Sequence, residues 1–282
     1  MSLNMKFILP LCLSIISALS GAEQPPFSPP LYAFQNGVHP ASAKKGILML
    51  KELGYPGIGS VYPKDLAKFK TACNDAGLEI FSIYAGGKVH AGSYQIDEHV
   101  IEAIHNLKGT KTLVELNVRR GNNPNDEQTI ELVREIADKA KDSGLKVVLY
   151  PHANFHIERL DHAVRIAKAT GRDNVGVTFN LCHFLKVQSG EDLAAALHDA
   201  KSLLWSISTC GADADGKDWK TLIRPLDEGN FDQTSLLKTL REIGFQGPIG
   251  LQCYNIKIDS RKHLARSRKA WEKHLAAVSR VE

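Results

Sequence analysis

The stretch KVVLYPHANFHIERLDHAVRIAKATGRDNVGVTFNLCH, residues 146–183, holds two apolar strand-like runs on either side of a helical segment. The segment 156–171 between the runs is amphipathic and ends at Gly171, a residue suited to the left-handed cap of a helix. Parallel strands need a crossover connection, and a helix is the usual one. This stretch therefore predicts a strand–helix–strand unit with parallel strands.

The same alternation extends along most of the chain. Strand-like runs lie at 31–37, 57–63, 79–87, 111–120, 146–155, 174–183, 203–212 and 248–256, with amphipathic segments between them. Eight strands alternating with helices predict a single closed (β/α)8 barrel, the TIM barrel. A doubly wound open sheet is the alternative, but the first strand-like run is followed by FQNGVHPASAKKG, which is not the Gly-rich phosphate loop that such sheets usually carry.

Length and composition agree with one domain. The 282 residues are 43% hydrophobic and 23% charged, enough for one large core. Residues 1–22 carry Lys6, an apolar run to about Leu19 and then small residues, the layout of a secretory signal peptide. We therefore expect a signal peptide at 1–22, a Pro-rich leader at 23–30 and the barrel at 31–282, in a protein exported to the periplasm or secreted, with no membrane association after cleavage.

Charge and cysteine content exclude several classes of protein. Removing Lys6 leaves 34 basic and 31 acidic residues, a net charge of +3, and no concentrated basic patch for a nucleic-acid backbone. Four cysteines remain after residue 22 and form no CxxC pair, so a zinc ribbon or redox motif is not indicated. They are expected to pack as small apolar residues, with one disulfide as the alternative.

Side-chain alternation divides each strand into two faces. In LVELNV, Val114, Leu116 and Val118 should face the helices, which turns Glu115 and Asn117 toward the barrel axis. The same parity turns a further set of mostly polar side chains inward, late in their strands: Tyr150, His152, Asn180, Cys182, Ser206, Ser208 and Gln252. Barrels of this class build their sites there, although these groups can also satisfy one another in the core.

The order of elements and several local phrases resemble the xylose-isomerase-like barrels, a superfamily of sugar isomerases, epimerases and endonuclease IV. The phrases are KVVLYPHANF, VGVTFNLCH and IRPLDEGNFDQTSLLKTLREIGFQGPIGLQCY, in order and at the family's spacing. The resemblance covers the chain from about Leu31 to the end and implies the TIM barrel fold.

The resemblance also implies a divalent metal held by Glu, Asp, His and Glu. At these positions this chain has Tyr150, Asn180, Ser208 (or Ser206) and Gln252. Metal sites draw their affinity from anionic oxygens and free imidazoles, whereas tyrosine and amides are neutral and weak ligands. We therefore expect no metal and no other cofactor at the family position.

The remaining titratable groups give the candidates for proton chemistry. Glu115 and His152 are predicted as catalytic residues, because a buried carboxylate or an imidazole can act as a base near neutral pH. Glu115 can instead pair with Arg119 or Arg120, and His152 can cap a loop.

Substrate binding is assigned to four inward polar residues and to two residues that the resemblance implies: His183, at the family's histidine position after the Asp, and Arg224, which matches a basic residue that approaches substrate oxygens in the related enzymes. These are Tyr150, Asn180, His183, Ser208, Arg224 and Gln252. Parity turns His183 outward, where it can merely bond a backbone carbonyl, and Arg224 can instead hold Asp227 or Glu228. Tyr32, Tyr62, Tyr84 and Tyr254 are expected to supply stacking surfaces.

Two functions remain open. The first is an exported sugar isomerase, epimerase or keto-glycoside lyase that acts on an uncharged sugar or keto-sugar by removing a proton next to a carbonyl, without the family metal. The second is a non-catalytic barrel that binds a carbohydrate or a partner. A DNA-repair endonuclease fits poorly, because that branch of the family needs several zinc ions and the matching residues here are mostly neutral. The expected partner is a small carbohydrate, and no nucleic acid.

Overall fold

The computed structural model describes residues 27–38 and 42–279. The predicted signal peptide and the first part of the leader lie outside these residues. In the described part of the chain, no helix is long and apolar enough to cross a membrane.

The strands form one curled sheet in the order β3-β2-β1-β10-β9-β8-β7-β6-β4-β5. Their bounds are β1 Leu31–Phe34, β2 Gly57–Gly59, β3 Glu79–Ile80, β4 Ser82–His90, β5 Ser93–Ile96, β6 Leu113–Arg120, β7 Lys146–Leu149, β8 Val175–Asn180, β9 Leu204–Thr209 and β10 Ile249–Leu251. All pairings are parallel except that of β4 with β5. Every predicted strand-like run contains a strand.

The barrel closes through a broken strand. β3 pairs with β2 and β4 pairs with β6, with only Phe81 between them. The backbone N–H of Phe81 donates to Ile58, and a parallel bridge joins Val61 to Ile83. β3 and β4 therefore act together as one barrel strand between β2 and β6. This confirms the predicted closed barrel. The hairpin of β4 with β5 was not predicted from the sequence.

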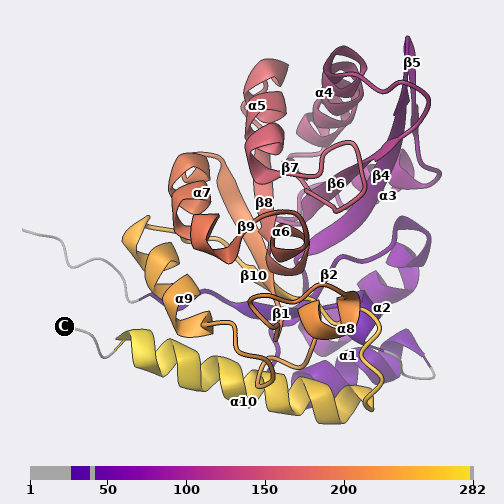
Figure 1. The fold of residues 1–282 in the computed structure, drawn as a ribbon. Coiled ribbons are helices and arrows are strands. Elements are labelled where there is room, and N and C mark those ends of the chain that lie inside the picture. The colour runs from indigo at the N-terminus through magenta and orange to yellow at the C-terminus, as the bar shows by residue number, and fades with distance from the viewer. Residues whose placement is uncertain (1–26, 39–41, 280–282) are drawn as a thin grey trace, which may run out of the picture.

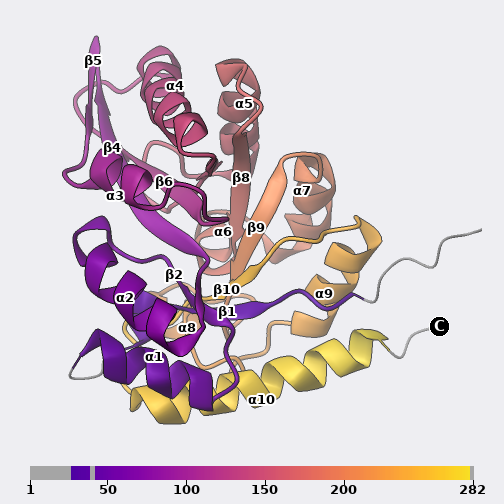
Figure 2. The ribbon, with the colours of Figure 1, turned by 180° about the vertical axis from the view of Figure 1, so that it is seen from behind.

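Helices surround the sheet (Figures 1 and 2). Their bounds are α1 Ala43–Glu52, α2 Leu66–Ala76, α3 Val100–Asn106, α4 Asp126–Asp142, α5 Leu160–Thr170, α6 Leu181–Val187, α7 Leu193–Ala200, α8 Trp219–Leu222, α9 Gln233–Glu242 and α10 Ser260–Ser279, with short 3-10 turns η1 Gln35–Gly37, η2 Pro63–Asp65 and η3 Gly190–Asp192. α2 and α5 end at Gly77 and Gly171, whose left-handed φ angles of 68° and 64° confirm the predicted caps.

The core has two layers. Aliphatic side chains between the sheet and the helices form the outer layer, which includes Val114 and Leu116 as the parity predicts. Inside the barrel, Tyr32, Phe34 and Tyr150 form a separate aromatic cluster, against which Phe81 and Tyr84 pack. The rings of Tyr32 and Phe81 are stacked with centroids 4.7 Å apart. The barrel interior is thus filled by aromatic rings below its mouth.

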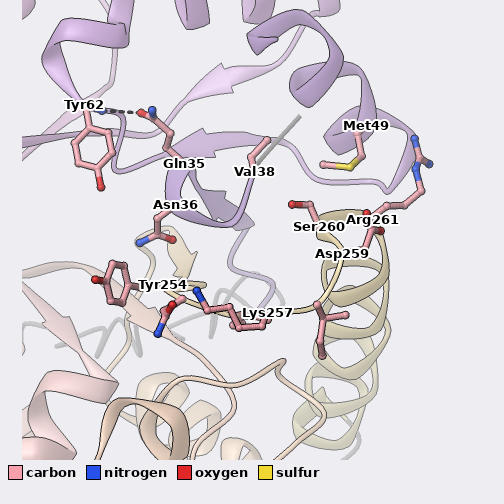
Figure 3. Close-up of a pocket in the computed structure, with 13 residues that line it drawn as sticks. Gln35, Asn36, Val38, Met49, Tyr62, Tyr254, Lys257, Asp259, Ser260 and Arg261 are labelled. Atoms are coloured by element: carbon pink, nitrogen blue, oxygen red, sulfur yellow. Dashed lines mark hydrogen bonds between the residues drawn. The ribbon is translucent and has the colours of Figure 1, made fainter. Parts of the chain in front are cut away.

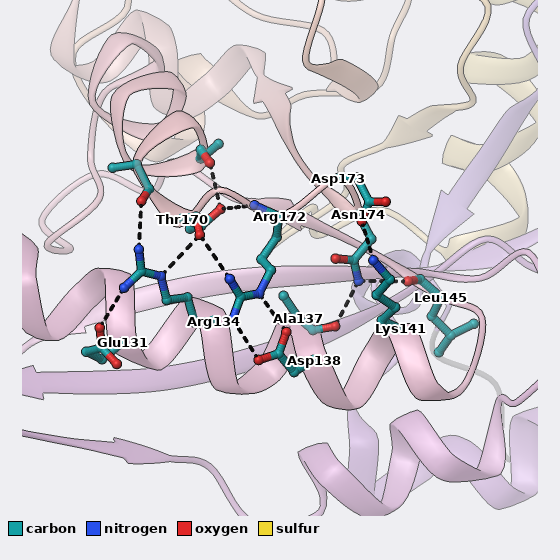
Figure 4. Close-up of polar contacts among 12 residues, drawn as sticks. Glu131, Arg134, Ala137, Asp138, Lys141, Leu145, Thr170, Arg172, Asp173 and Asn174 are labelled. Carbon is teal, nitrogen blue, oxygen red and sulfur yellow. Dashed lines mark hydrogen bonds and ion pairs between the residues drawn. The ribbon is translucent and has the colours of Figure 1, made fainter.

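Polar contacts fix α4 to the turn before β8 (Figure 4). The buried amide of Asn174 donates to the carbonyl of Ala137 at 2.8 Å and to that of Leu145 at 3.3 Å. Close by, the exposed guanidinium of Arg172 pairs with Asp138 at 2.7 Å. The buried bonds join α4 to β8 and so hold the strand that supplies Asn180.

All four cysteines among the described residues are buried and free of disulfides. They pack as small apolar residues, as predicted. The alternative of one disulfide is not observed.

Candidate functional site

A cavity of about 370 Å³ lies at the mouth of the barrel, over the carboxyl ends of the strands. Barrels of this class place their sites at this end, in a concave and largely apolar pocket. The lining residues come from many different strand ends and loops: Asn36, Ser60, Tyr62, Tyr84, Tyr150, His152, Ala153, Asn154, Phe155, His183, Trp219, Ile223, Gln252 and Tyr254. Among the described residues, none of the side chains that line it is Asp, Glu, Lys or Arg.

Tyr150 lines this cavity and contacts Asn180, which is buried behind it. They follow or end the adjacent strands β7 and β8, and the amide of Asn180 donates to the Tyr150 hydroxyl. The Asn180 oxygen in turn accepts from the thiol of Cys182 at 3.1 Å. Burial raises the pKa of Tyr150 well above its usual value, so the phenol stays neutral and its proton is free to be donated into the cavity.

Gln252 also lines the cavity, and three hydrogen-bond donors hold its side-chain oxygen. Its side-chain oxygen accepts from the Asn36 amide at 2.6 Å and from the backbone N–H groups of Cys253 and Tyr254, both at 3.0 Å. Its orientation is therefore fixed by protein contacts, with the amide nitrogen left to bind a hydroxyl.

The rings of His152 and His183 lie against each other, with centroids 3.9 Å apart and planes tilted by 37°. The Nδ1 atom of His152 contacts the carbonyl of Ala153 at 2.9 Å, and a carbonyl only accepts, so Nδ1 carries the proton. The Nδ1 of His183 accepts the backbone N–H of Ala153 at 3.3 Å. Burial lowers the pKa of both imidazoles, that of His183 most strongly, so both are neutral near pH 7.

The expected outward orientation of His183 is wrong. β8 ends at Asn180 and α6 begins at Leu181, so strand parity no longer applies two residues later. The helical turn carries the imidazole into the cavity, where its Nδ1 accepts from the backbone N–H of Ala153; it bonds no carbonyl of the residues that the structure describes.

Glu115 lies inside the barrel, below the cavity, and does not line it. Its Oε1 accepts from the Tyr32 hydroxyl at 3.3 Å, across the barrel from β6 to β1. Burial raises the pKa of this carboxyl to about 7, partly opposed by the side chains of Ser82, Ser60 and Tyr32. Its other oxygen has no partner with hydrogen-bond geometry within the described residues.

Neither arginine that follows in β6 pairs with Glu115. Arg119 pairs with Asp97, and Arg120 pairs with Glu158 at 3.5 Å. Successive side chains of β6 alternate, so Arg119 lies on the face of Glu115 but four residues further along the strand, and Arg120 lies on the other face. The alternative interpretation of Glu115 as half of an arginine pair is thus wrong.

Ser60 connects the cavity with the carboxyl below it. It lines the cavity and is one of the groups that lower the pKa of Glu115. Its backbone has a φ of 50°, the left-handed region that serine rarely adopts, and its N–H donates to the Ser82 hydroxyl at 2.7 Å. Such strain is commonly found at functional positions.

Of the predicted substrate-binding residues, Asn180, Ser208 and Arg224 are not part of the cavity lining. Ser208 is buried in β9, and its hydroxyl has no partner among the described residues. Arg224 pairs with Asp213 at 2.8 Å. It does not hold Asp227 or Glu228, because Arg266 of α10 lies closer and binds both.

The four side chains at the metal position do not suit a dication. Tyr150 is a protonated phenol, Ser208 is an alcohol, and the oxygens of Asn180 and Gln252 already accept hydrogen bonds. None supplies a carboxylate or an imidazole. Donors of this kind give a divalent ion little attraction.

Several lining residues were missed in the sequence. Trp219 is the first residue of the short helix α8, Phe155 lies in the loop after β7, and Asn36 lies in η1. None of the three lies in a strand of the structure, where side-chain alternation would have marked it as inward-facing. Tyr62, Tyr84 and Tyr254 do line the cavity as expected, whereas Tyr32 lies below it with Glu115.

A second, wider cavity of about 1000 Å³ adjoins the first (Figure 3). Asn36, Tyr62 and Tyr254 border both. The backbone N–H of Tyr62 donates to the Gln35 side chain at 2.8 Å, which fixes this shared wall.

The chain resembles known proteins in sequence and in fold. The family model described as xylose isomerase-like TIM barrel matches residues 47–277. No curated protein matches the sequence significantly.

Solved structures share the fold at low sequence identity. A 3-keto-D-glucoside 4-epimerase, YcjR, from E. coli has a TM-score of 0.65 and 18% identity, over 87% of this chain and 99% of that one. An L-ribulose 3-epimerase has a TM-score of 0.69 and 14% identity, over 90% and 96%. A xylose isomerase-like TIM barrel protein from Mycobacterium smegmatis, solved in complex with magnesium, has a TM-score of 0.62 and 19% identity, over 89% and 98%.

Proposed function

Because the chain belongs to the xylose isomerase-like TIM barrel family, we propose that it is a sugar isomerase or epimerase that acts on an uncharged sugar or keto-sugar without the family metal. Proteins of similar fold include a 3-keto-D-glucoside 4-epimerase and an L-ribulose 3-epimerase. A keto-glycoside lyase would begin with the same proton removal.

The chemistry of the cavity lining supports an uncharged sugar as the substrate. The cavity at the mouth presents aromatic rings, amides and neutral imidazoles, and none of its lining residues in the described chain is Asp, Glu, Lys or Arg. Sugar hydroxyls bind amides well, and sugar rings pack on aromatic faces. A phosphorylated sugar would need a cation or a helix N-terminus at its phosphate, so the lining favours a sugar without phosphate.

His152 is the proposed base. Because its Nδ1 carries the proton, Nε2 has the free lone pair that can take a proton from the carbon next to the substrate carbonyl. The electron pair left behind moves onto the carbonyl oxygen as an enolate. Tyr150, which keeps its own proton, donates a hydrogen bond to this oxygen. Return of the proton to the opposite face of the same carbon, once the enolate has turned that face to His152, gives an epimer. Return of the proton to the former carbonyl carbon, with the proton of the adjacent hydroxyl passing to the enolate oxygen, gives an isomer.

Glu115 is proposed to store a proton under the site. With a pKa of about 7, it holds a proton on about half of the molecules at neutral pH. Ser60, which lines the cavity and lowers the pKa of Glu115, gives a polar route between substrate and carboxyl. In this role Glu115 buffers the site and does not touch the substrate.

The test is isotope exchange. Chelator-treated protein is incubated in D2O with 3-keto-glucosides and with common ketoses, and deuterium at the carbon next to the carbonyl is followed by NMR. Exchange by the unmodified chain and by the control His198→Gln, on the exposed face of α7, with loss in His152→Gln, is the expected result. If no substrate exchanges, the proposal fails.

The second candidate is a non-catalytic barrel that binds a carbohydrate. The absence of a lining carboxylate among the described residues favours it, because relatives with proton chemistry commonly rely on acidic groups. Titration calorimetry separates the two: saturable binding of a sugar that undergoes no exchange supports this candidate.

Export is proposed from the sequence of residues 1–22, which lie outside the described chain. N-terminal sequencing of protein recovered outside the cytoplasm tests it. A mature chain that begins near residue 23 is expected, and recovery of the intact N-terminus in the cytoplasm contradicts it.

A further inference from the structure

A second group of polar side chains converges beside the barrel mouth, away from the cavity lining. Asp126 begins α4, His156 lies in the loop after β7, and His162 lies in the first turn of α5. One carboxylate oxygen and one nitrogen from each imidazole lie within 4.8 Å of one another. We infer that these three side chains form a binding site for a transition-metal ion, best suited to Zn²⁺.

The spacing of the donor atoms supports this. Ligands held about 2.0–2.1 Å from a tetrahedral zinc ion lie about 3.3 Å from each other. The Oδ1 atom of Asp126 lies 3.4 Å from Nε2 of His156 and 2.8 Å from Nε2 of His162. These two distances lie within about 0.5 Å of the tetrahedral spacing, and the two imidazole nitrogens lie within 4.8 Å of each other, so a small approach of the rings would give three of four tetrahedral positions, with water as the fourth ligand.

The burial of His156 and the missing hydrogen bond at its Nε2 atom are a second, independent observation. Its side chain is only 10% exposed, and its Nε2 atom has no hydrogen-bond partner among the described residues. A buried imidazole nitrogen without a partner costs free energy that a hydrogen bond or a metal would recover. This nitrogen faces the Asp126 carboxylate at a distance too long for a good hydrogen bond but suited to a shared ion.

The surrounding charges are compatible with a bound dication. Arg165 pairs with the other carboxylate oxygen, Oδ2, at 3.0 Å and leaves Oδ1 for the metal. The Arg165 side chain is 59% exposed, so it can turn into solvent when an ion binds. Two imidazoles and one carboxylate favour Zn²⁺ over Mg²⁺, which prefers oxygen ligands alone.

A metal here would stiffen the wall of the cavity. His156 follows Phe155, whose ring stacks on His152 with centroids 3.9 Å apart. The backbone N–H of His156 also donates to Val118 in β6 at 2.8 Å. The ion would therefore tie α4 and α5 to the loop that carries His152. This inference does not depend on the proposed activity.

The experiment measures zinc binding to the purified full chain after chelator treatment. Competition calorimetry should give one high-affinity ion per chain, with at least about tenfold weaker binding in Asp126→Asn and in His162→Gln. His105→Gln, at an exposed position of α3, is the control and should bind as the unmodified chain does. Circular dichroism checks that each variant is folded.

X-ray absorption of the zinc-loaded unmodified chain gives a readout that needs no variant. Nitrogen and oxygen scatterers with two imidazoles are expected. Sulfur in the first shell would place the ion at the buried cysteines and overturn the inference. Equal zinc affinity in all variants, or no saturable binding to the unmodified chain, would overturn it as well.

Discussion

Replacing Glu115 with Gln should change how the stability of the protein depends on pH. The carboxyl is fully buried, and burial raises its pKa from an ordinary 4.5 to about 7. Between pH 4.5 and pH 7, the carboxyl of Glu115 mostly keeps its proton in the folded chain and mostly loses it in the unfolded chain. The stabilisation that the protonated carboxyl gives is therefore fully present below pH 4.5 and is lost as the pH rises through 7.

The magnitude follows from the two pKa values. At about 1.36 kcal/mol for each pH unit between them, ionising the buried carboxyl costs the folded state about 3 kcal/mol. Most of this loss, about 2.5 kcal/mol, falls between pH 5 and pH 8.5. Glutamine keeps the size of the side chain and an oxygen that can accept from Tyr32, but it does not titrate.

Urea unfolding at a series of pH values measures the effect. The free energy of unfolding of Glu115→Gln, relative to the unmodified chain, should increase by about 2.5 kcal/mol from pH 5 to pH 8.5. The control Glu242→Gln, at an exposed position of α9, should follow the unmodified chain at every pH. A difference between Glu115→Gln and the unmodified chain that stays constant with pH would refute the reasoning.

Three further results are expected. His152→Gln should slow isotope exchange at least about a hundredfold while sugar affinity by calorimetry stays within about threefold, and an equal loss of both would contradict its role as base. Trp219→Ala should weaken sugar binding about tenfold in the same titration, because the ring forms part of the cavity wall; unchanged affinity would exclude it from the binding surface. In urea unfolding, Asn174→Ala should lower the free energy of unfolding by about 1–3 kcal/mol, because two buried carbonyls lose their donor. Arg172→Ala, which removes an ion pair at the surface, should change this free energy little. A larger loss in Arg172→Ala than in Asn174→Ala would contradict this prediction.

The barrel could be predicted from sequence because its signals are local and repeated. Each strand carries its own apolar run, and glycines such as Gly77 and Gly171 mark helix ends. Parity also placed Glu115 correctly, because β6 is regular from Leu113 to Arg120. The β4–β5 hairpin escaped prediction because β5 has only four residues, none of them buried, and therefore carries no apolar run.

The candidate site was less predictable, because much of it lies where regular structure ends. Parity failed for His183 once β8 gave way to α6. Trp219 comes from the segment between β9 and β10 and has no periodic pattern to mark it. The partner of Arg224 depends on tertiary contacts, since Asp213 and Arg266 approach from other segments.

The neutral lining of the cavity also determines how a ligand reaches it. A cleft lined by one sign of charge attracts counter-ions from a distance, and dissolved salt weakens that attraction. The described residues that line the smaller cavity include no Asp, Glu, Lys or Arg to create such a field. Ligand encounter should then be governed by diffusion and shape, and should proceed at similar rates in dilute and in brackish surroundings.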